Sequence, residues 1–275
     1  MGTEQEDQLK IANSATSQRI TIRVGRGTLS FSMPGNDGNV VFEPYVVKSG
    51  ISMAANLREA FRTSDLLLQA PRRARVLVDS DVLMVPIELF EVGDMDQWHH
   101  HAYPRKEQDA IYYNVLPDLN AVSVFSMNKD LRLVIDDHFQ DVRLLSVITP
   151  VWRHLHQRSY TGTRHKLYGY FHEQRLEVFS YQQNRFKFCN SFGAKEAHDA
   201  LYFLLYVWKQ LQLQPQYDEL HIVGDIPEQQ WLIAELRKYL QKAYIINPVA
   251  DFNRAQVTEI KNMPYDLQTL FVKGR

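Results

Sequence analysis

Two short glycine-containing turns are the segments of this sequence best suited to holding a phosphate. Gly25 to Gly27 (Gly-Arg-Gly) follows an alternating apolar segment, and Gly224 follows the apolar pair Ile222 and Val223. Glycine allows backbone N–H groups to approach phosphate oxygens closely. However, the chain has no GxxxxGKS or GxxxxGKT loop, and the first turn lacks the third glycine and the following helix of a dinucleotide-binding motif. Taken alone, the first turn is therefore predicted to be a tight connection between two strands.

An acidic pair, Asp79 and Asp81, follows the short apolar segment Arg75–Val78. The two residues have the same parity, so both side chains can point the same way at the carboxyl end of a strand, where open α/β sheets bind ligands. The competing interpretation is structural, because Asp81 can cap a following element. We favour capping.

The histidines and the single cysteine are weaker candidates. His99, His100 and His101 lie near Asp94 and Asp96, and a set of His and carboxylate ligands can bind zinc. Adjacent residues of an extended chain point alternately, so this segment is predicted to be a polar surface loop, and we expect no metal site. Cys189 lies in an alternating aromatic segment and is predicted to be a strand residue.

Composition excludes several classes of protein. The chain has 275 residues, with 31 basic and 32 acidic residues, so it lacks the positive charge that binding to a nucleic-acid backbone requires. Its longest unbroken apolar run, Leu201–Trp208, is too short to cross a bilayer, and no signal-peptide core is found near the start. One cysteine allows no internal disulfide. We expect a cytoplasmic protein without membrane insertion.

The first half predicts a meander followed by a helix and further strands. Residues 1–18 are polar and are expected to be a flexible tail. Period-2 alternation predicts strands at about 20–24, 29–33 and 40–47, and a 3.6-residue period predicts a helix at about 51–68. A short strand at 75–79 follows, then extra material at about 82–149, and a helix that begins near Pro150.

The second half repeats this order. Strands are predicted at about 167–171, 176–179 and 186–190, then a helix at 196–213 that is apolar around much of its girth and is therefore expected to be buried on several sides. A strand at 220–223 precedes a helix with a capping-box pattern, Asp225 to Glu228, and a last strand follows at 244–246. An offset of 147 residues maps Ile20 onto Leu167, and an offset of 144 maps Asp81 onto Asp225. Self-similarity at this spacing indicates two copies of one domain.

The repeated order of meander, helix, strand, helix and strand resembles that of the actin-like ATPase (sugar kinase, Hsp70 and actin) fold, over about residues 19–250. The second half (TRHKLYGYFHEQRLEVFSYQQNRFKFCNSF) resembles in particular an uncharacterised bacterial family with a degenerate form of this fold. In architecture it is similar to the actin-like pilus-assembly and type II secretion proteins. The resemblance implies an α/β, RNase H-like fold with mixed sheets. The two lobes would span 19–160, with an inserted subdomain at about 82–149, and 161–275.

The resemblance also implies where a nucleotide would bind. Working members hold ATP between two hairpins, each with an Asp-x-Gly-type turn. Here the first turn reads Arg23-Val24-Gly25, and the second reads Tyr170-Phe171-His172, so both lack the carboxylate. The adenosine motif keeps one glycine of its usual pair. Arg23, Gly25, Gly27 and Gly224 therefore remain weak candidates for a degenerate nucleotide cleft, and no catalytic residue is assigned.

These observations leave two main functional hypotheses. The leading one is a non-catalytic actin-like scaffold that binds another protein and no nucleic acid, with a homodimer left open. The alternative is an ATP-binding protein or weak Mg-dependent ATPase with degenerate phosphate loops. A metal-dependent enzyme built on the histidine segment ranks third.

Overall fold

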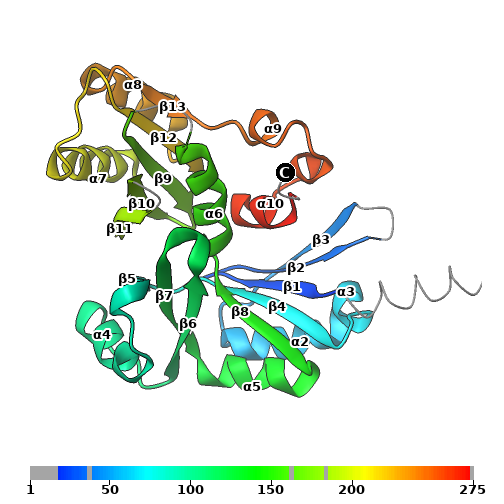
Figure 1. The fold of residues 1–275 in the computed structure, drawn as a ribbon. Helices are drawn as coiled ribbons and strands as arrows, with labels where there is room; N and C mark the ends of the chain where they lie inside the picture. The colour runs from blue at the N-terminus through cyan, green and yellow to red at the C-terminus, as the bar shows by residue number, and fades with distance from the viewer. Residues whose placement is uncertain (1–17, 36–38, 161–163, 183–184, 273–275) are drawn as a thin grey trace, which may run out of the picture. The chain divides into compact units, whose positions relative to one another are not determined.

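The computed structural model describes residues 18–35, 39–160, 164–182 and 185–272 (Figure 1). Except for residue 18, the tail expected at 1–18 lies outside the described residues. The chain divides into two compact units. The first comprises the chain up to Val82 with His99–Tyr112 and Phe125–Val147, and the second comprises Leu83–Trp98, Tyr113–Val124 and the chain from Ile148 onward.

The first unit contains a five-stranded mixed sheet of order β3-β2-β1-β4-β8. Its first three strands form the expected antiparallel meander, and β4 and β8 add to it in parallel to β1. The strands are β1 (Ile20–Val24), β2 (Leu29–Pro34), β3 (Val40–Tyr45), β4 (Arg73–Val78) and β8 (Asp141–Ser146).

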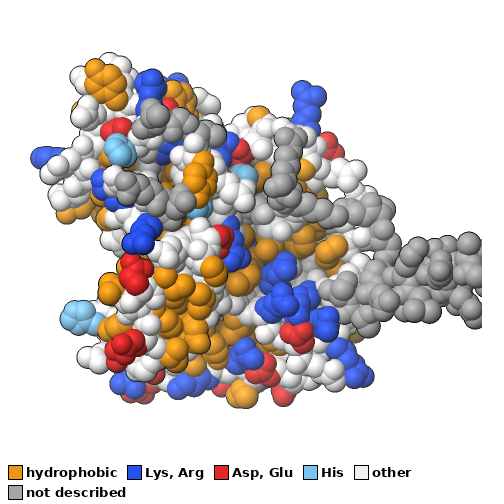
Figure 2. All heavy atoms as spheres, in the orientation of Figure 1, with side chains coloured by type: hydrophobic (Ala, Val, Ile, Leu, Met, Phe, Trp, Pro, Cys, Tyr) orange, Lys and Arg blue, Asp and Glu red, His pale blue; other side chains and the backbone are white. Residues whose placement is uncertain are grey.

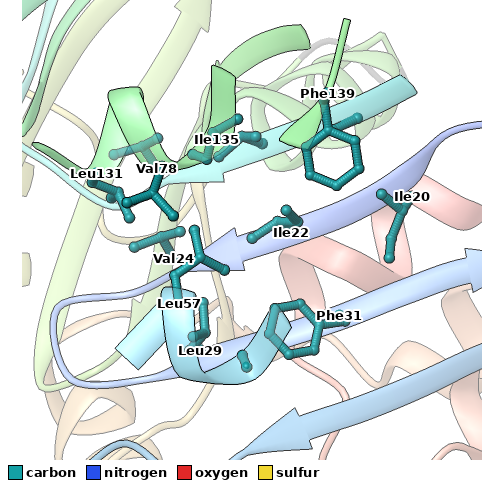
Figure 3. Packing of buried hydrophobic residues seen from close by; sticks show 14 of the residues in the cluster. Ile20, Ile22, Val24, Leu29, Phe31, Leu57, Val78, Leu131, Ile135 and Phe139 are labelled. Atoms are coloured by element: carbon teal, nitrogen blue, oxygen red, sulfur yellow. The ribbon is translucent and has the colours of Figure 1, made fainter. Parts of the chain in front are cut away.

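One face of this sheet carries the hydrophobic core (Figure 3). Alternate residues of β1 pack with helices α2 (Met53–Thr63) and α5 (Lys129–His138), so that Ile22, Leu57 and Ile135 are fully buried. The helix predicted at 51–68 is in fact divided into α2 and α3 (Asp65–Leu68). Ser64 lies at the break, where its Oγ accepts a hydrogen bond from the Leu67 amide at 3.2 Å, so its side chain starts a new helix.

The second unit contains the matching sheet, of order β11-β10-β9-β12-β13. Helices α7 (Ala197–Gln210) and α8 (Gln229–Tyr239) contribute to the core on one face, and α6 (Ile148–Ser159) and α10 (Tyr265–Phe271) pack against each other. The strands are β9 (Lys166–His172), β10 (Arg175–Gln182), β11 (Arg185–Gly193), β12 (Glu219–Gly224) and β13 (Ala243–Ile245).

The two sheets have the same strand order and the same directions, which confirms the duplicated actin-like fold. A main-chain hydrogen bond recurs at the same place in each. The Asp79 amide donates to the Val24 carbonyl at 2.9 Å, and the Asp225 amide donates to the Phe171 carbonyl at 2.9 Å. Asp225 therefore corresponds to Asp79, and the predicted match to Asp81 is wrong by two residues.

The extra material of the first half centres on a three-stranded sheet of order β5-β7-β6, with helix α4 (Met95–Ala102). Its strands are β5 (Val82–Pro86), β6 (Asp109–Leu116) and β7 (Ala121–Asn128). Part of the range expected to be inserted belongs elsewhere, because β8 pairs with β4 in the first five-stranded sheet.

Two expectations for the second-half helices are wrong in detail. Helix α8 begins at Gln229 after Glu228, which adopts a left-handed conformation (φ 40°) and makes no side-chain cap, so the helix starts later than a capping box at Asp225 would place it. Helix α7 buries Leu204 and Trp208 but leaves Tyr202 62% exposed, so one side is open. After α8, the chain forms the short helix α9 (Pro248–Asp251) before α10. No helix among the described residues is long and apolar enough to span a membrane.

Candidate functional site

The first candidate turn connects β1 to β2 at the carboxyl end of β1. The Gly25 amide donates to the Thr28 carbonyl at 2.8 Å and closes the turn. Arg23 is 3% exposed, and its Nη1 donates to Thr28 Oγ1 at 3.0 Å. The residue that replaces the family's carboxylate therefore contacts the turn itself.

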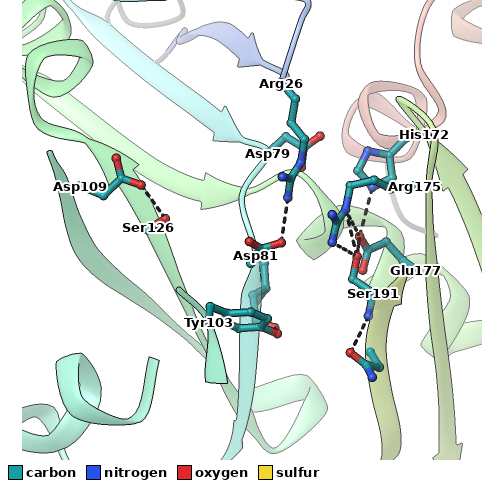
Figure 4. A network of polar contacts seen from close by, with 12 residues as sticks. Arg26, Asp79, Asp81, Tyr103, Asp109, Ser126, His172, Arg175, Glu177 and Ser191 are labelled. Carbon is teal, nitrogen blue, oxygen red and sulfur yellow. Dashed lines mark hydrogen bonds and ion pairs between the residues drawn. The ribbon is translucent and has the colours of Figure 1, made fainter. Parts of the chain in front are cut away.

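Arg26, at the tip of this turn, pairs with the acidic residues that follow β4 (Figure 4). Its Nη2 lies 2.9 Å from Asp81 Oδ1, and its Nε lies 3.4 Å from Asp79 Oδ1. The Asp79 side chain is only 2% exposed. Burial is the largest effect on the pKa of Arg26 and lowers it, but Asp79 and Asp81 together raise it above the ordinary value. Asp81 is thus an ion-pair partner, and the capping role predicted for it is wrong.

The second candidate turn, between β9 and β10, contains only Glu173 and Gln174, both with positive φ (44° and 65°). A two-residue turn of this kind closes the hairpin tightly. His172, which precedes it, is 3% exposed and stacks on Tyr170 with ring centroids 4.9 Å apart. The Tyr170 hydroxyl donates to Asp266 Oδ2 of α10 at 2.8 Å, and Asp266 is fully buried.

A polar cluster lies beside this second turn (Figure 4). Ser191 Oγ donates to Glu177 Oε1 at 2.7 Å and accepts from Arg175 Nε at 3.1 Å, while His172 Nε2 lies 3.4 Å from the same Glu177 oxygen. The aromatic pair and this cluster lie beside the turn between β9 and β10, which the sequence comparison of the two halves matched to the first turn.

Gly224 ends β12 with φ +99°, in the left-handed region. A Cβ at this position would overlap the carbonyl oxygen of Phe171, so glycine is needed for the close approach of the two strands. Gly224 also lines a cavity of about 580 Å³ at the carboxyl ends of β12 and β13. Polar and aromatic residues of helices α8 and α10 and of the loops after β12 and β13 share this lining, among them Asp225, Gln229, Asn247, Tyr265 and Gln268.

The structure brings Arg23, Gly25 and Gly27 together at the first turn and places Gly224 in the second unit. The histidine segment lies on helix α4 and is not the expected loop; His99 is 3% exposed, with its Nε2 3.3 Å from the Asp81 carbonyl. Within the described ranges, no three His, Cys, Asp or Glu residues are grouped to hold a metal. Burial, followed by Glu177, raises the pKa of the Cys189 thiol, which disfavours a nucleophilic thiolate.

Sequence reasoning missed two residues of these turns. Arg26 was seen only as part of a Gly-Arg-Gly turn, and its position beside Asp79 and Asp81 depends on the parallel pairing of β1 with β4. Asp266, which holds Tyr170, is 96 residues away along the chain and carries no local signal.

Comparison with solved structures defines the class of protein. A Bacteroides thetaiotaomicron protein with actin-like ATPase fold and unknown function superposes with a TM-score of 0.82 at 26% identity, covering 95% of this chain and 98% of that one. A PilM-PilN type IV pilus biogenesis complex matches with a TM-score of 0.57 at 13% identity, covering 94% and 98%. This protein has the actin-like ATPase fold, and the predicted likeness to pilus-assembly proteins is confirmed at the level of the fold.

The family follows from the sequence itself. The model of the family described as "Protein of unknown function (DUF3822)" matches residues 6–243, and the chain belongs to that family. No curated protein matches the sequence.

Proposed function

We propose that this protein is a non-catalytic binding protein on an actin-like frame. The observation that carries this proposal is that side chains of the chain itself occupy both phosphate turns. In the first turn Arg26 pairs with Asp79 and Asp81, and in the second His172 stacks on Tyr170. Phosphoryl transfer depends on positioning Mg²⁺ and the transferred phosphate, mainly through carboxylates and backbone N–H groups. Neither turn offers the carboxylate of the family's Asp-x-Gly pattern.

The expected partner is another protein. The net charge of −1 argues against a nucleic acid. The PilM-PilN structure, which has the same fold, is a complex with a second protein, which agrees with this proposal. The single cysteine supports a cytoplasmic setting. The lobe boundaries at 19–160 and 161–275, and Arg23, Gly25, Gly27 and Gly224 as remnants of a nucleotide site, stay part of the proposal.

One observation favours the second candidate, an ATP-binding protein or weak ATPase. The cavity of about 580 Å³ at the ends of β12 and β13 has the size of a small-molecule site, and ligands of open α/β sheets bind at that edge. Tyr265 and Gln268 add an aromatic ring and an amide to its lining. A nucleoside would fit this cavity without using either phosphate turn.

A thermal-shift series with adenosine, ADP, Mg-ATP and divalent metals separates these candidates, because a ligand that binds only the folded state raises the melting temperature. The series uses Arg143→Gln, which weakens the separate phosphate site proposed below. In this variant the binding-protein proposal predicts no shift with any of these ligands. A shift with adenosine that is lost in Gln229→Trp, which fills the cavity, and kept in the control Lys238→Trp on the same helix would favour the second candidate. A shift with Mg-ATP much larger than with adenosine would contradict the leading proposal.

A further inference from the structure

The face of the first sheet opposite the hydrophobic core carries a group of arginines. Ile20, Ile22 and Val24 of β1, and Ala74, Val76 and Val78 of β4, point into the core. Successive strand residues point to opposite faces, so the intervening residues of β1, β4 and β8 share the other face. Figure 2 shows Lys and Arg side chains gathered over β4 and β8.

Three residues of this face form one row across neighbouring strands. Thr21 of β1 is paired with Arg75 of β4, and Arg75 is paired with Arg143 of β8. Directly paired residues of neighbouring strands have their side chains side by side on the same face. Arg143 is exposed and Arg75 is partly exposed, so both guanidinium groups can be reached from solvent.

The arginines of the adjacent row form ion pairs with a carboxylate, whereas Arg75 and Arg143 form no such close pair. Asp141 forms ion pairs with Arg19 and Arg73, and Arg19 Nη1 also donates to the Asp141 carbonyl at 3.0 Å. Among the described residues, the side chains of Arg75 and Arg143 form no hydrogen bond and no ion pair within 4 Å, although Arg143 attracts the Asp141 carboxylate at longer range. Burial, followed by repulsion from Arg143 and Arg19, lowers the pKa of the Arg75 guanidinium. The cost of holding these like charges together falls when an anion binds between them.

The same row also contains buried hydroxyl groups that form no hydrogen bond among the described residues. The hydroxyl of Thr21 is buried and has no partner in the part of the chain that the structure describes, and neither has that of Ser32, which pairs with Thr21 across β2. Buried hydroxyls are normally hydrogen-bonded, so an orphaned one beside two arginines is a donor available to a ligand oxygen.

We propose that Arg75, Arg143 and Thr21 form a binding site for a dianionic phosphate group. Two guanidinium groups balance the charge of a phosphate near pH 7, and their planar forks bind its oxygens in pairs. A carboxylate carries half that charge. The site lies three residues before the carboxyl end of β4, about 10 Å along the strand from the Arg26 turn, so it is separate from both phosphate turns. It does not depend on the function proposed above.

The proposal is tested by calorimetric titration with inorganic phosphate, O-phosphoserine and acetate at constant ionic strength. We expect phosphate to bind and acetate not to bind. Arg75→Gln and Arg143→Gln should each weaken phosphate binding about tenfold or more, the effect of losing one charge-assisted contact. Binding of phosphoserine as well would assign a phosphorylated group on a larger molecule as the ligand; binding of phosphate alone would assign the free ion.

Two controls keep the result interpretable. Arg58→Gln makes the same change of charge on the exposed side of α2 and should leave phosphate affinity unchanged. Without ligand, Arg143→Gln should melt within a few degrees of the wild type, because removing Arg143 relieves its repulsion with Arg75 but also removes its attraction to Asp141. Equal phosphate affinity in the wild type and Arg143→Gln, or equal binding of acetate and phosphate, would overturn the proposal.

Discussion

Arg26 Nη2 lies 2.9 Å from Asp81 Oδ1, so the turn that corresponds to a phosphate loop is joined by an ion pair to the end of the neighbouring strand. Backbone N–H groups at such a turn would face a nucleotide phosphate in a working ATPase of this fold. Here the Arg26 side chain lies at the turn, and its positive charge is balanced by Asp81 and Asp79. The turn between β1 and β2 is therefore held to the end of β4 within the first unit.

Coupling between Arg26 and Asp81 is the first prediction. A double-mutant cycle of Arg26→Gln and Asp81→Asn should give an interaction free energy of about 0.5–2 kcal/mol in urea unfolding. The value should stay below that of a fully buried pair because the Arg26 side chain is 34% exposed. A cycle of Arg58→Gln with Asp81→Asn serves as the control. An interaction free energy of zero between Arg26 and Asp81 would show that this ion pair does not contribute to stability.

Gly224 gives a second prediction. Gly224→Ala should lower the free energy of unfolding by about 2 kcal/mol or more, because it combines a strained φ of +99° with overlap of the Phe171 carbonyl. Gly193→Ala is the matched control, since no atom lies within 4 Å of a Cβ built there. Equal melting temperatures for the two variants would mean that the backbone at Gly224 relaxes freely.

His154 predicts a pH dependence of stability. Its Nε2 lies 2.6 Å from Asp251 Oδ2, and Arg158 pairs with the same carboxylate. Burial, followed by repulsion from Arg158, lowers the pKa of His154 from 6.5 to about 4. We attribute the lowering despite the nearby Asp251 to the fact that Arg158 already neutralises that carboxylate. Between pH 6.5 and about pH 4, the unfolded chain binds more protons at His154 than the folded chain does. The contribution of neutral His154 to the free energy of unfolding is therefore complete above pH 6.5 and is lost as the pH falls towards 4.

Urea unfolding at a series of pH values from about 7.5 to 4.5 checks this sign for His154. The wild type should lose more stability on acidification than His154→Asn, whereas the control His101→Gln, exposed on α4, should follow the wild type. If the wild type became more stable relative to His154→Asn at low pH, the histidine would be charged and paired with Asp251 in the folded state.

The core of the second unit gives a fourth prediction. Leu204 of α7 is fully buried, so Leu204→Ala should cost about 2–5 kcal/mol, as cavity-forming changes do. Tyr202→Ala, on the exposed side of the same helix, should cost less than about 1 kcal/mol. Similar losses in the two variants would show that α7 is held by its tyrosine side and not by the core.

The sequence predicted the first meander because apolar Ile20, Ile22 and Val24, which pack in the core, alternate with polar residues in β1. Burial itself does not alternate, since every residue of β1 and β9 is buried. Helix ends were less predictable. Ser64 can continue a helix or cap the next one, and in the structure it ends α2 and its side chain caps α3. The fold was therefore accessible from periodicity, whereas the exact boundaries depended on tertiary packing.

The candidate site was predicted only in part. Loss of the carboxylates at Arg23 and Tyr170 could be read directly from the two turn sequences. What fills each turn could not, because the Arg26–Asp81 and Tyr170–Asp266 contacts join residues far apart in the chain.

Our last prediction is that neither turn holds a nucleotide phosphate. Its most direct test compares the affinities of Mg-ATP and adenosine by calorimetry, in Arg143→Gln so that the proposed phosphate site on the first sheet does not contribute. We expect Mg-ATP to bind to this variant no more tightly than adenosine, with no release of phosphate. Mg-ATP that bound about 100-fold more tightly than adenosine, a difference of about 2.7 kcal/mol, would contradict it.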